Sequence, residues 1–399
     1  MVTLIRGAEI FAPEPLGVRD ILVEGSRIAH IGEVDPAGIA ALPGAQVIDA
    51  SGLTACPGFI DPHVHITGGG GEGGYATRTP EIAVTDIIRS GVTTVVGCLG
   101  TDSVTRTHAG LLAKARGLEE EGITAFVYTG SYQLPARTIT GSVVDDIVLI
   151  DRVIGAGEIA VSERRSFQPT IEALADIVSQ CHVGGLLSGK AGITHFHVGS
   201  HESRLAPLHR LLDDYPIAPP AVYATHITRD EELLADAVAL AAKGAFVDMT
   251  AGASTVESVR RYVELGGDLD RLTLSSDANG SLPRFDAQGR LIDLTVADQS
   301  TLFEQVWACA ESSGLSLSQV LALVTANTAD ALKLSRKGRI APRHDADLLL
   351  FDEGRTFRHG FAMGHQTISY GRLQVRGTFD AAPSQTTRSQ SPPGRSGRD

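Results

Sequence analysis

Short apolar runs alternate with amphipathic segments along most of the chain. Eight of these runs have the length and apolar content of strands buried on both faces: residues 59–65, 93–98, 123–129, 154–162, 193–198, 222–226, 245–250 and 272–277. Segments with helical periodicity lie between them, such as 230–243 and 256–265. Strands that alternate with helices form parallel sheets, and eight such units predict a closed (β/α)8 TIM barrel over residues 58–338. A doubly wound open sheet is the alternative, but no Gly-x-Gly-x-x-Gly sequence follows the first strand.

Shorter strands are predicted near both ends of the chain. Their patterns cover residues 21–23, 27–31, 346–351 and 367–376. Residues 24–26, Glu-Gly-Ser, have the composition of a hairpin turn between the first two. We predict that the end segments, residues 1–57 and 339–377, meet in one small β domain.

Three further segments have local signatures. Thr79 followed by Pro80 is typical of a helix start, with Thr79 as the N-cap and Pro80 at the first helical position. That helix should end near Gly91. After the eighth strand, helices are expected to continue to about Leu334. Residues 378–399 are rich in Ser, Pro, Gln and Arg with almost nothing apolar, which predicts a disordered tail.

The composition of the chain argues against several classes of function. The chain has 399 residues, is 43% hydrophobic and carries a formal net charge of −13, so nucleic-acid binding is not expected. Its 4 cysteines have no Cys-x-x-Cys spacing, which argues against disulfides and a thiolate zinc site. No secretory signal and no apolar run of membrane-spanning length is seen. A soluble, cytoplasmic protein without a membrane partner is therefore expected.

Histidines and one acid stand where the predicted strands end. In chain order they are His63, His65, His195, His197, His226 and Asp277. His63 and His65 are two residues apart on one strand, so their side chains point to the same face. The C-terminal ends of barrel strands meet at one face of the barrel. Imidazoles and a carboxylate gathered there from four strands predict a metal site with open coordination positions.

These motifs resemble those of the binuclear amidohydrolase superfamily. The shared pattern is Pro-Gly-Phe-Ile-Asp-x-His-x-His, then a His on each of two later strands, then Ser-Ser-Asp. Longer segments resemble the isoaspartyl (β-aspartyl) dipeptidase family, at residues 68–72, 77–80, 100–102, 131–132, 137–142, 151–155 and 276–281. The resemblance extends to about Gly377.

The resemblance implies two zinc ions, bound by His63, His65, His197, His226 and Asp277. The first two histidines and the aspartate would hold one ion, and the other two histidines the second. His195 lies two residues from His197 and shares its face, so spacing alone does not choose between them. The family motif Phe-His-x-Gly selects His197.

The chain departs from the family at the metal bridge. The family uses a carbamylated lysine on the fourth strand, yet no lysine lies between Lys114 and Lys190. Glu158 stands at that position, and we predict that it bridges the two ions without CO2. Its side chain is shorter by roughly 3–4 Å, but segment 155–157 looks one residue longer than the family pattern, and the flexible Gly157 could bring the backbone closer. The alternative is a solvated loop residue at Glu158, with water as the bridge.

One acid and two arginines are expected at the mouth of the barrel. Glu72 lies in the glycine-rich run 68–74, which lacks the Gly-Lys-Ser/Thr sequence of a phosphate loop. Arg165 follows the fourth strand and Arg229 follows the sixth, and guanidinium groups pair bidentately with carboxylates. One anion and two cations suit a β-aspartyl dipeptide, which has one ammonium and two free carboxylates. The resemblance implies that Glu72 binds the ammonium, and that Arg165 and Arg229 bind the carboxylate of the leaving residue.

The resemblance also implies a mechanism. The aspartyl α-carboxylate would be bound by Gly70, Thr101 and Ser281. A hydroxide that bridges the metals would attack the side-chain amide, while Tyr132 donates a hydrogen bond to the oxyanion. Asp277 would take the proton of the hydroxide and return it to the leaving amine. The expected activity is hydrolysis of β-aspartyl dipeptides.

Two other functions stay open at this point. A cyclic amidohydrolase of the dihydroorotase or hydantoinase kind would use the same metals, but its ring substrates have no free amino group for Glu72. A non-catalytic scaffold homologue would usually have lost metal ligands, and metal analysis separates it from the enzymes. The resemblance further implies a homo-oligomer, such as an octamer, with a small dipeptide as the partner.

Overall fold

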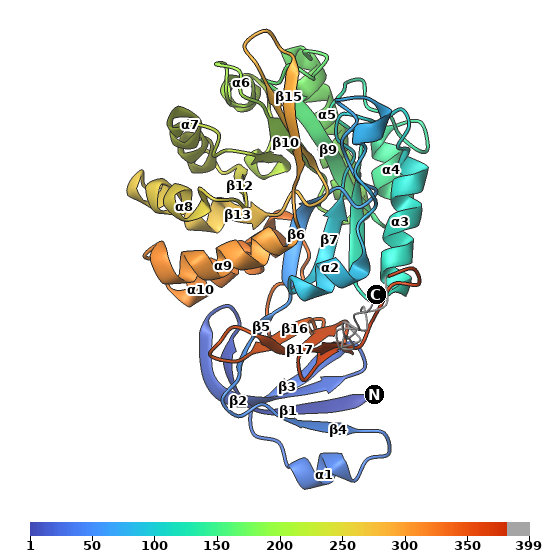
Figure 1. The fold of residues 1–399 in the computed structure, drawn as a ribbon, viewed down its shortest axis with the longest axis vertical. Coiled ribbons are helices and arrows are strands. Elements are labelled where there is room, and N and C mark those ends of the chain that lie inside the picture. The colour runs from blue at the N-terminus through green and yellow to red at the C-terminus, as the bar shows by residue number, and fades with distance from the viewer. Residues whose placement is uncertain (381–399) are drawn as a thin grey trace, which may run out of the picture.

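The computed structural model describes residues 1–380 and contains a sheet of eight parallel strands. The sheet curves around a common axis with helices outside it (Figure 1). The strands are β6 (Phe59–Val64), β7 (Val92–Gly97), β8 (Thr124–Thr129), β9 (Val153–Val161), β10 (Ile193–Val198), β11 (Val222–Thr225), β12 (Phe246–Thr250) and β13 (Leu272–Ser275). They pair in chain order from β6 to β13. A parallel bridge between Val64 and Ala278 joins the two ends of this sheet. The predicted TIM barrel is therefore confirmed, and the doubly wound sheet is excluded.

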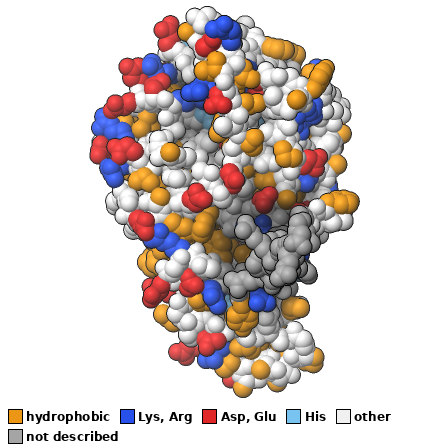
Figure 2. Space-filling model, viewed as in Figure 1, with side chains coloured by type: hydrophobic (Ala, Val, Ile, Leu, Met, Phe, Trp, Pro, Cys, Tyr) orange, Lys and Arg blue, Asp and Glu red, His pale blue; other side chains and the backbone are white. Residues whose placement is uncertain are grey.

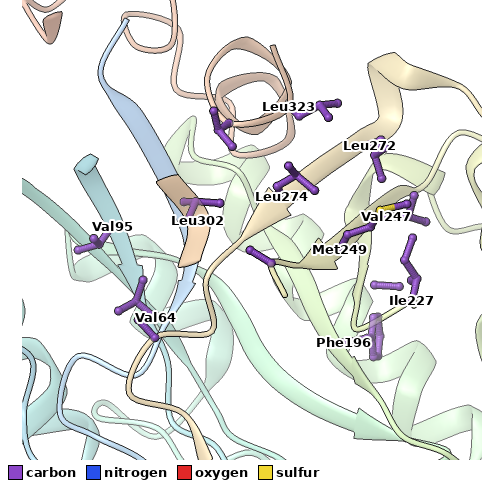
Figure 3. Close-up of a cluster of buried hydrophobic side chains, with 14 of the residues drawn as sticks. Val64, Val95, Phe196, Ile227, Val247, Met249, Leu272, Leu274, Leu302 and Leu323 are labelled. Atoms are coloured by element: carbon purple, nitrogen blue, oxygen red, sulfur yellow. The ribbon is translucent and has the colours of Figure 1, made fainter. Parts of the chain in front are cut away.

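Helices surround the barrel and bury its outer face. They are α2 (Val84–Arg89), α3 (His108–Glu120), α4 (Val143–Leu149), α5 (Ile171–Ser188), α6 (Ala206–Asp214), α7 (Glu231–Ala242), α8 (Thr255–Glu264), α9 (Ser300–Ser312), α10 (Leu317–Leu323) and α11 (Ala326–Ala331). Short 3-10 turns are η1 (Tyr75–Thr77), η2 (Pro219–Ala221) and η3 (Leu269–Arg271). Figure 3 shows Leu302 of α9 and Leu323 of α10 in one apolar cluster with Leu274 of β13. This layer holds the strands in place.

The helix predicted to start at Thr79 begins later in the chain. The N-cap of α2 is Ala83, so the prediction of Thr79 as N-cap and Pro80 as first helical residue is wrong. The Thr79 hydroxyl instead accepts from the Gly69 amide at 2.6 Å and donates to the Asn279 carbonyl at 2.7 Å. These tertiary hydrogen bonds replace the local cap, and they hold the glycine-rich loop beside the end of the eighth strand.

A second sheet lies below the barrel in Figure 1 and is built from both ends of the chain. Its strands are β1 (Val2–Phe11), β2 (Pro15–Glu24), β3 (Arg27–Ile31), β4 (Gln46–Asp49), β5 (Thr54–Pro57), β16 (Leu348–Phe351), β17 (Phe357–Ala362), β18 (His365–Ser369) and β19 (Arg372–Leu373). The short helix α1 (Pro36–Ala40) packs against β4. Antiparallel pairing of β5 with β16 joins the two segments. The separate sheet predicted from the chain ends is confirmed.

Some strands were predicted only in part, and others were not predicted. The stretch predicted as one strand, 367–376, is a hairpin of β18 and β19 around Tyr370 and Gly371, whose φ angles are 49° and 76°. Strand β17 was not predicted. Neither was the hairpin of β14 (Ser281–Phe285) and β15 (Leu291–Val296), which follows the eighth barrel strand. From residue 381 onward, the predicted disordered tail lies outside the described residues.

The surface carries both signs of charge. On the face shown in Figure 2, acidic and basic side chains are interspersed with apolar ones. None of the helices within residues 1–380 combines the length and apolar character that a membrane span needs.

Candidate metal centre and substrate pocket

The residues predicted at the strand ends lie together at the C-terminal end of the barrel. His63 lies in β6, with His65 directly after it, and His197 lies in β10. His226 and Asp277 follow β11 and β13, with φ angles of 65° and 54°. Such left-handed angles are uncommon outside glycine and recur at functional sites. All five side chains are buried.

Glu158 of β9 lies between the four histidines. Its Oε2 is 3.0 Å from His63 Nε2, 3.2 Å from His197 Nδ1 and 3.5 Å from His226 Nε2. Its Oε1 is 3.3 Å from His65 Nε2. Burial by itself raises the pKa of Glu158, but His63 and the other histidines hold that pKa well below its usual value. Glu158 is thus an ionised, buried strand residue rather than a solvated loop residue.

A β-bulge brings Glu158 to this position. Thr194 of β10 pairs with Ala156, whereas Phe196 pairs with Ile159, so β9 contains one more residue than β10 over this stretch. Gly157 packs tightly on β10, because an added Cβ would lie 2.7 Å from the Cβ of His195. The bulge turns the Glu158 side chain toward the histidines.

Asp277 faces the two histidines of the first strand. Its Oδ1 is 3.1 Å from His65 Nε2 and 3.4 Å from His63 Nε2. Burial raises the pKa of Asp277, but His63 and His65 outweigh it and bring the pKa to about 2. Cys98 was not predicted here, and its Sγ lies 3.8 Å from His65 Nδ1.

The donor atoms of these side chains fit metal ions. Three groups of potential ligands have their donor atoms within 4.8 Å of one another: His63, His65, Cys98 and Glu158; His63, His226 and Asp277; and Glu158, His197 and His226. Among the described residues, His63 Nε2, Glu158 Oε1 and Asp277 Oδ1 are buried and lie close to one another's side chains without forming a hydrogen bond of good geometry. Buried polar atoms normally have partners, and cations between these atoms would provide them. Imidazole together with carboxylate suits zinc or a similar transition-metal ion.

His195, which spacing alone could not distinguish from His197, lies deeper in the barrel. Its ring stacks on Tyr128 with centroids 5.2 Å apart and contacts Tyr223 edge-on at 5.1 Å. Burial and the neighbouring His63 hold the pKa of His195 well below its usual value. Of the two histidines on this strand, His197 and not His195 contacts Glu158.

Beneath the site, hydrogen bonds between polar side chains connect the ends of three barrel strands. The Asp248 carboxylate on β12 accepts hydrogen bonds from Thr225 at 2.6 Å, Thr273 at 2.7 Å and Ser275 at 2.6 Å. Thr225 directly precedes His226, so this bond positions the histidine through the backbone. Burial raises the pKa of Asp248 to about 6.

A cavity of about 250 Å³ opens beside the histidine cluster. Its walls include His65, Gly70, Thr101, Tyr132, Arg165, His197, His226, Arg229, Asp277 and Ser281. Gly70 has a φ of 77°, and a Cβ there would lie 2.4 Å from the Thr77 carbonyl oxygen, so only glycine fits. The cavity is thus lined by four of the predicted metal ligands and by the predicted substrate residues other than Glu72.

Glu72 is the common hydrogen-bond acceptor among the residues predicted to bind the substrate. Its Oε1 accepts from Ser281 Oγ at 2.8 Å, Arg165 Nη1 at 3.0 Å and Thr101 Oγ1 at 3.3 Å. Its side chain is only 6% exposed. Three residues predicted to bind the two carboxylates of a substrate therefore converge on one oxygen atom of Glu72, which is predicted to bind its ammonium.

Tyr132 and Arg229 approach the cluster from the cavity. Tyr132 Oη is 2.8 Å from His197 Nδ1, and burial together with Glu158 holds the tyrosine pKa well above its usual value. Its hydroxyl is therefore neutral and able to donate. Arg229 Nε donates to the Val198 carbonyl at 2.8 Å, and its Nη2 lies 3.5 Å from His197 Nε2.

Glu163 was missed in the sequence. It is 7% exposed, contacts His197 and forms an ion pair with Arg165. Burial raises its pKa, but His197 and Arg165 hold that pKa well below the usual value. Its position just after the fourth strand, two residues before Arg165, is the signal that could have found it.

Residues 54–368 match the model of the amidohydrolase family, and the chain belongs to that family. Among solved structures it is similar to the β-aspartyl dipeptidase of Fervidobacterium islandicum AW-1 in complex with β-Asp-Leu dipeptide. The two chains are 43% identical, with a TM-score of 0.89, and the match covers 94% of this chain and 99% of the other. The resemblance inferred from the sequence is confirmed.

Other relatives match less of the chain or are less similar. The dihydroorotase of Bacillus licheniformis is 40% identical over 89 residues, and the match covers 22% of this chain and 19% of that protein. The imidazolonepropionase of Streptomyces coelicolor is 26% identical over 371 residues, covering 85% of this chain and 87% of that protein. The names of these two relatives denote enzymes with different substrates.

Proposed function

We propose that the protein is a metal-dependent hydrolase that cleaves β-aspartyl dipeptides. The observation that carries the proposal is the single cavity lined by both the histidine cluster and the Arg165, Arg229 and Ser281 side chains. Similarity to a β-aspartyl dipeptidase over 94% of the chain supports it. The metal side suits hydrolysis of an amide, and the charged side suits a small zwitterion.

The residues of the cluster would hold two zinc ions. His63, His65 and Asp277 would bind one ion and His197 and His226 the other, with Glu158 as a ligand that both ions share. When bound, such ions lower the pKa of water to about 7 and polarise a carbonyl oxygen. Glu158 would supply the carboxylate that the carbamylated lysine supplies in the family, so no CO2 would be required.

Substrate binding would exchange ion pairs within the pocket. Glu72 and Arg165 pair with each other at 3.0 Å. A β-aspartyl dipeptide would bring its ammonium to Glu72 and the carboxylate of its leaving residue to Arg165 and Arg229. The hydroxyls of Thr101 and Ser281, released from Glu72, would donate to the aspartyl α-carboxylate together with the backbone at Gly70. Because each broken pair is replaced, a zwitterion binds at little electrostatic cost.

Two side chains would move protons or stabilise charge during the reaction. Asp277 is ionised, so it would accept a proton from the attacking water and pass it to the leaving amine. The neutral Tyr132 hydroxyl would donate a hydrogen bond to the oxyanion that forms on the amide carbonyl. Both face the cavity beside the histidines.

Hydrolysis assays on β-Asp-Leu, α-Asp-Leu and dihydroorotate test the proposal, with metal analysis of the same sample. We expect kcat/KM for the β isomer to exceed that for the α isomer by on the order of 100-fold, because the α isomer leaves a charge unpaired. Equal values for the two isomers would contradict it. Turnover of dihydroorotate alone would indicate a cyclic amidohydrolase, and a protein without metal or activity would indicate a scaffold.

We also propose that the protein forms homo-oligomers. Val183, Leu186 and Leu187 on α5 are 44%, 67% and 69% exposed, which suits a contact between subunits. Sedimentation equilibrium measures the assembly directly, and a monomer at micromolar concentration would contradict this proposal.

A further inference from the structure

Glu163 contacts a predicted substrate residue and a predicted metal ligand at once. Its Oε1 accepts from Arg165 Nε at 3.1 Å and from the Arg165 amide at 3.0 Å. Its Oε2 accepts from Arg165 Nη2 at 3.2 Å and lies 3.3 Å from His197 Nε2. One buried carboxylate is thus shared between the two sides of the pocket.

The two nitrogens of His197 face opposite partners. Nδ1 lies 3.2 Å from Glu158 Oε2 and 2.8 Å from the Tyr132 hydroxyl, whereas Nε2 lies 3.3 Å from Glu163 Oε2. A neutral imidazole that binds a metal through Nδ1 carries its proton on Nε2. That N–H can donate to Glu163 but not to Arg229, whose Nη2 is itself a donor and lies farther away, at 3.5 Å. A carboxylate behind a ligating histidine holds the ring orientation and its tautomer.

Glu163 also determines which edge of Arg165 faces the cavity. The Nε and Nη2 edge of the guanidinium is held by the Glu163 carboxylate in a two-point pair. The remaining Nη1 points to Glu72 at 3.0 Å and so toward the substrate side. Gln133 donates to the Arg165 carbonyl at 2.7 Å and adds a further restraint on this loop.

We propose that Glu163 is a positioning residue that couples the substrate-binding Arg165 to the metal-binding His197. This inference rests on the metal site of the proposed function, but it does not depend on which dipeptide is cleaved. Loss of the shared carboxylate would loosen the metal ligand and misplace the guanidinium together. Neither effect requires Glu163 to touch the substrate.

The test uses the zinc-loaded protein and its Glu163→Gln variant. The amide keeps the size of the side chain but has one acceptor oxygen, and its NH2 group opposes the donors of Arg165 or His197. We expect zinc to be lost to a chelator at least about tenfold faster, for one of the two ions only. We also expect a rise in KM for β-Asp-Leu of about tenfold or more.

Glu72→Gln is the matched control, because Glu72 contacts Arg165 but no predicted metal ligand. It should raise KM while zinc loss stays at the wild-type rate. If Glu163→Gln also keeps both ions at that rate, the coupling is disproved and Glu163 serves Arg165 alone. If the wild-type protein binds no zinc, the proposed function fails instead.

Glu163→Asp provides a second variant in case the amide variant does not fold. The shorter side chain cannot bridge Arg165 and His197, so zinc loss and KM should both rise. An aspartate variant that keeps both zinc ions at the wild-type rate would overturn the proposal as well.

Discussion

The two sides of the pocket are built on different parts of the fold. The strand side holds the predicted metal ligands, and the loop side holds the predicted substrate-binding residues. The histidines and Glu158 lie on strands or one residue beyond them, where backbone pairing with neighbouring strands sets their spacing. Glu72, Arg165 and Ser281 lie in loops or at the start of a hairpin, and they are held by pairing with one another. Strands are the more rigid support, which reactive groups need. Loops can change without loss of the barrel, which suits the groups that choose the substrate.

The largest expected effect comes from the carboxylate on the strand side. Glu158→Gln keeps the shape of the side chain but removes its charge, so metal or activity should be lost. We expect kcat/KM to fall on the order of 1000-fold, equivalent to about 4 kcal/mol. Glu172→Gln on the exposed surface of α5 is the control and should change neither.

The same site predicts independence from CO2. Metal-free protein should regain full activity with zinc alone in CO2-depleted buffer. A need for bicarbonate would show that Glu158 is not the bridge, as would a Glu158→Gln variant with normal metal content and rate.

Asp248 should make the strand side sensitive to pH. The pKa of Asp248 is about 6 in the fold, against about 3.9 in an unfolded chain. Between these values the folded chain keeps a proton that the unfolded chain releases. The contribution of Asp248 to the free energy of unfolding is therefore greatest below pH 4. It falls by about 3 kcal/mol as the pH rises through 6.

Asp248→Asn has no such titration. Urea unfolding at pH 4, 5, 6 and 7 measures the difference between the variant and the wild type, which cancels the contribution shared by the metal ligands. The difference should shift in favour of the variant as the pH rises. A difference that is constant with pH would show that Asp248 titrates normally.

Gly157 tests how closely the bulge must pack. An Ala side chain would meet the Cβ of His195 at 2.7 Å and push β9 away from β10. We expect Gly157→Ala to lower the free energy of unfolding by about 2 kcal/mol and to weaken zinc binding. Gly117→Ala on α3 is the contrast, because nothing lies within 4 Å of the added Cβ. It should stabilise the fold by about 0.5–1 kcal/mol, and equal effects of the two changes would refute the packing argument.

The smallest expected effect lies on the loop side. Arg229→Lys keeps the positive charge but loses the guanidinium fork, so KM for β-Asp-Leu should rise by about tenfold with little change in kcat. Steady-state kinetics separates the two constants. A change confined to kcat would mean that Arg229 acts in the chemistry and not in binding.

Strand periodicity predicted the strand side well. His63 and His65 are two residues apart in a buried run, so their shared direction follows from the pleat alone. The same rule could not separate His195 from His197, because alternate residues share a face at different depths. The layer to which each belongs depends on the tilt and stagger of the strands, which no local pattern contains.

The loop side was less predictable from local patterns. Thr79 has the signature of a helix N-cap, yet its hydroxyl bonds to Gly69 and Asn279, which is 200 residues away in the chain. Glu163 is an ordinary acid in a polar segment until the fold brings His197 to it. The roles assigned to Thr101 and Ser281 came from resemblance to a family and not from their spacing. Contacts between loops depend on tertiary structure, which explains both failures.

The pairing of β5 with β16 has a consequence for folding. These strands are roughly 290 residues apart in the chain, a separation that raises the contact order and slows folding. During synthesis, the strands of the barrel leave the ribosome before β16 and β17 can complete the smaller sheet. Until then the free edge of β5 is exposed to pairing with other chains. We therefore expect aggregation to compete with folding until β16 arrives, and a chaperone to be useful during that interval.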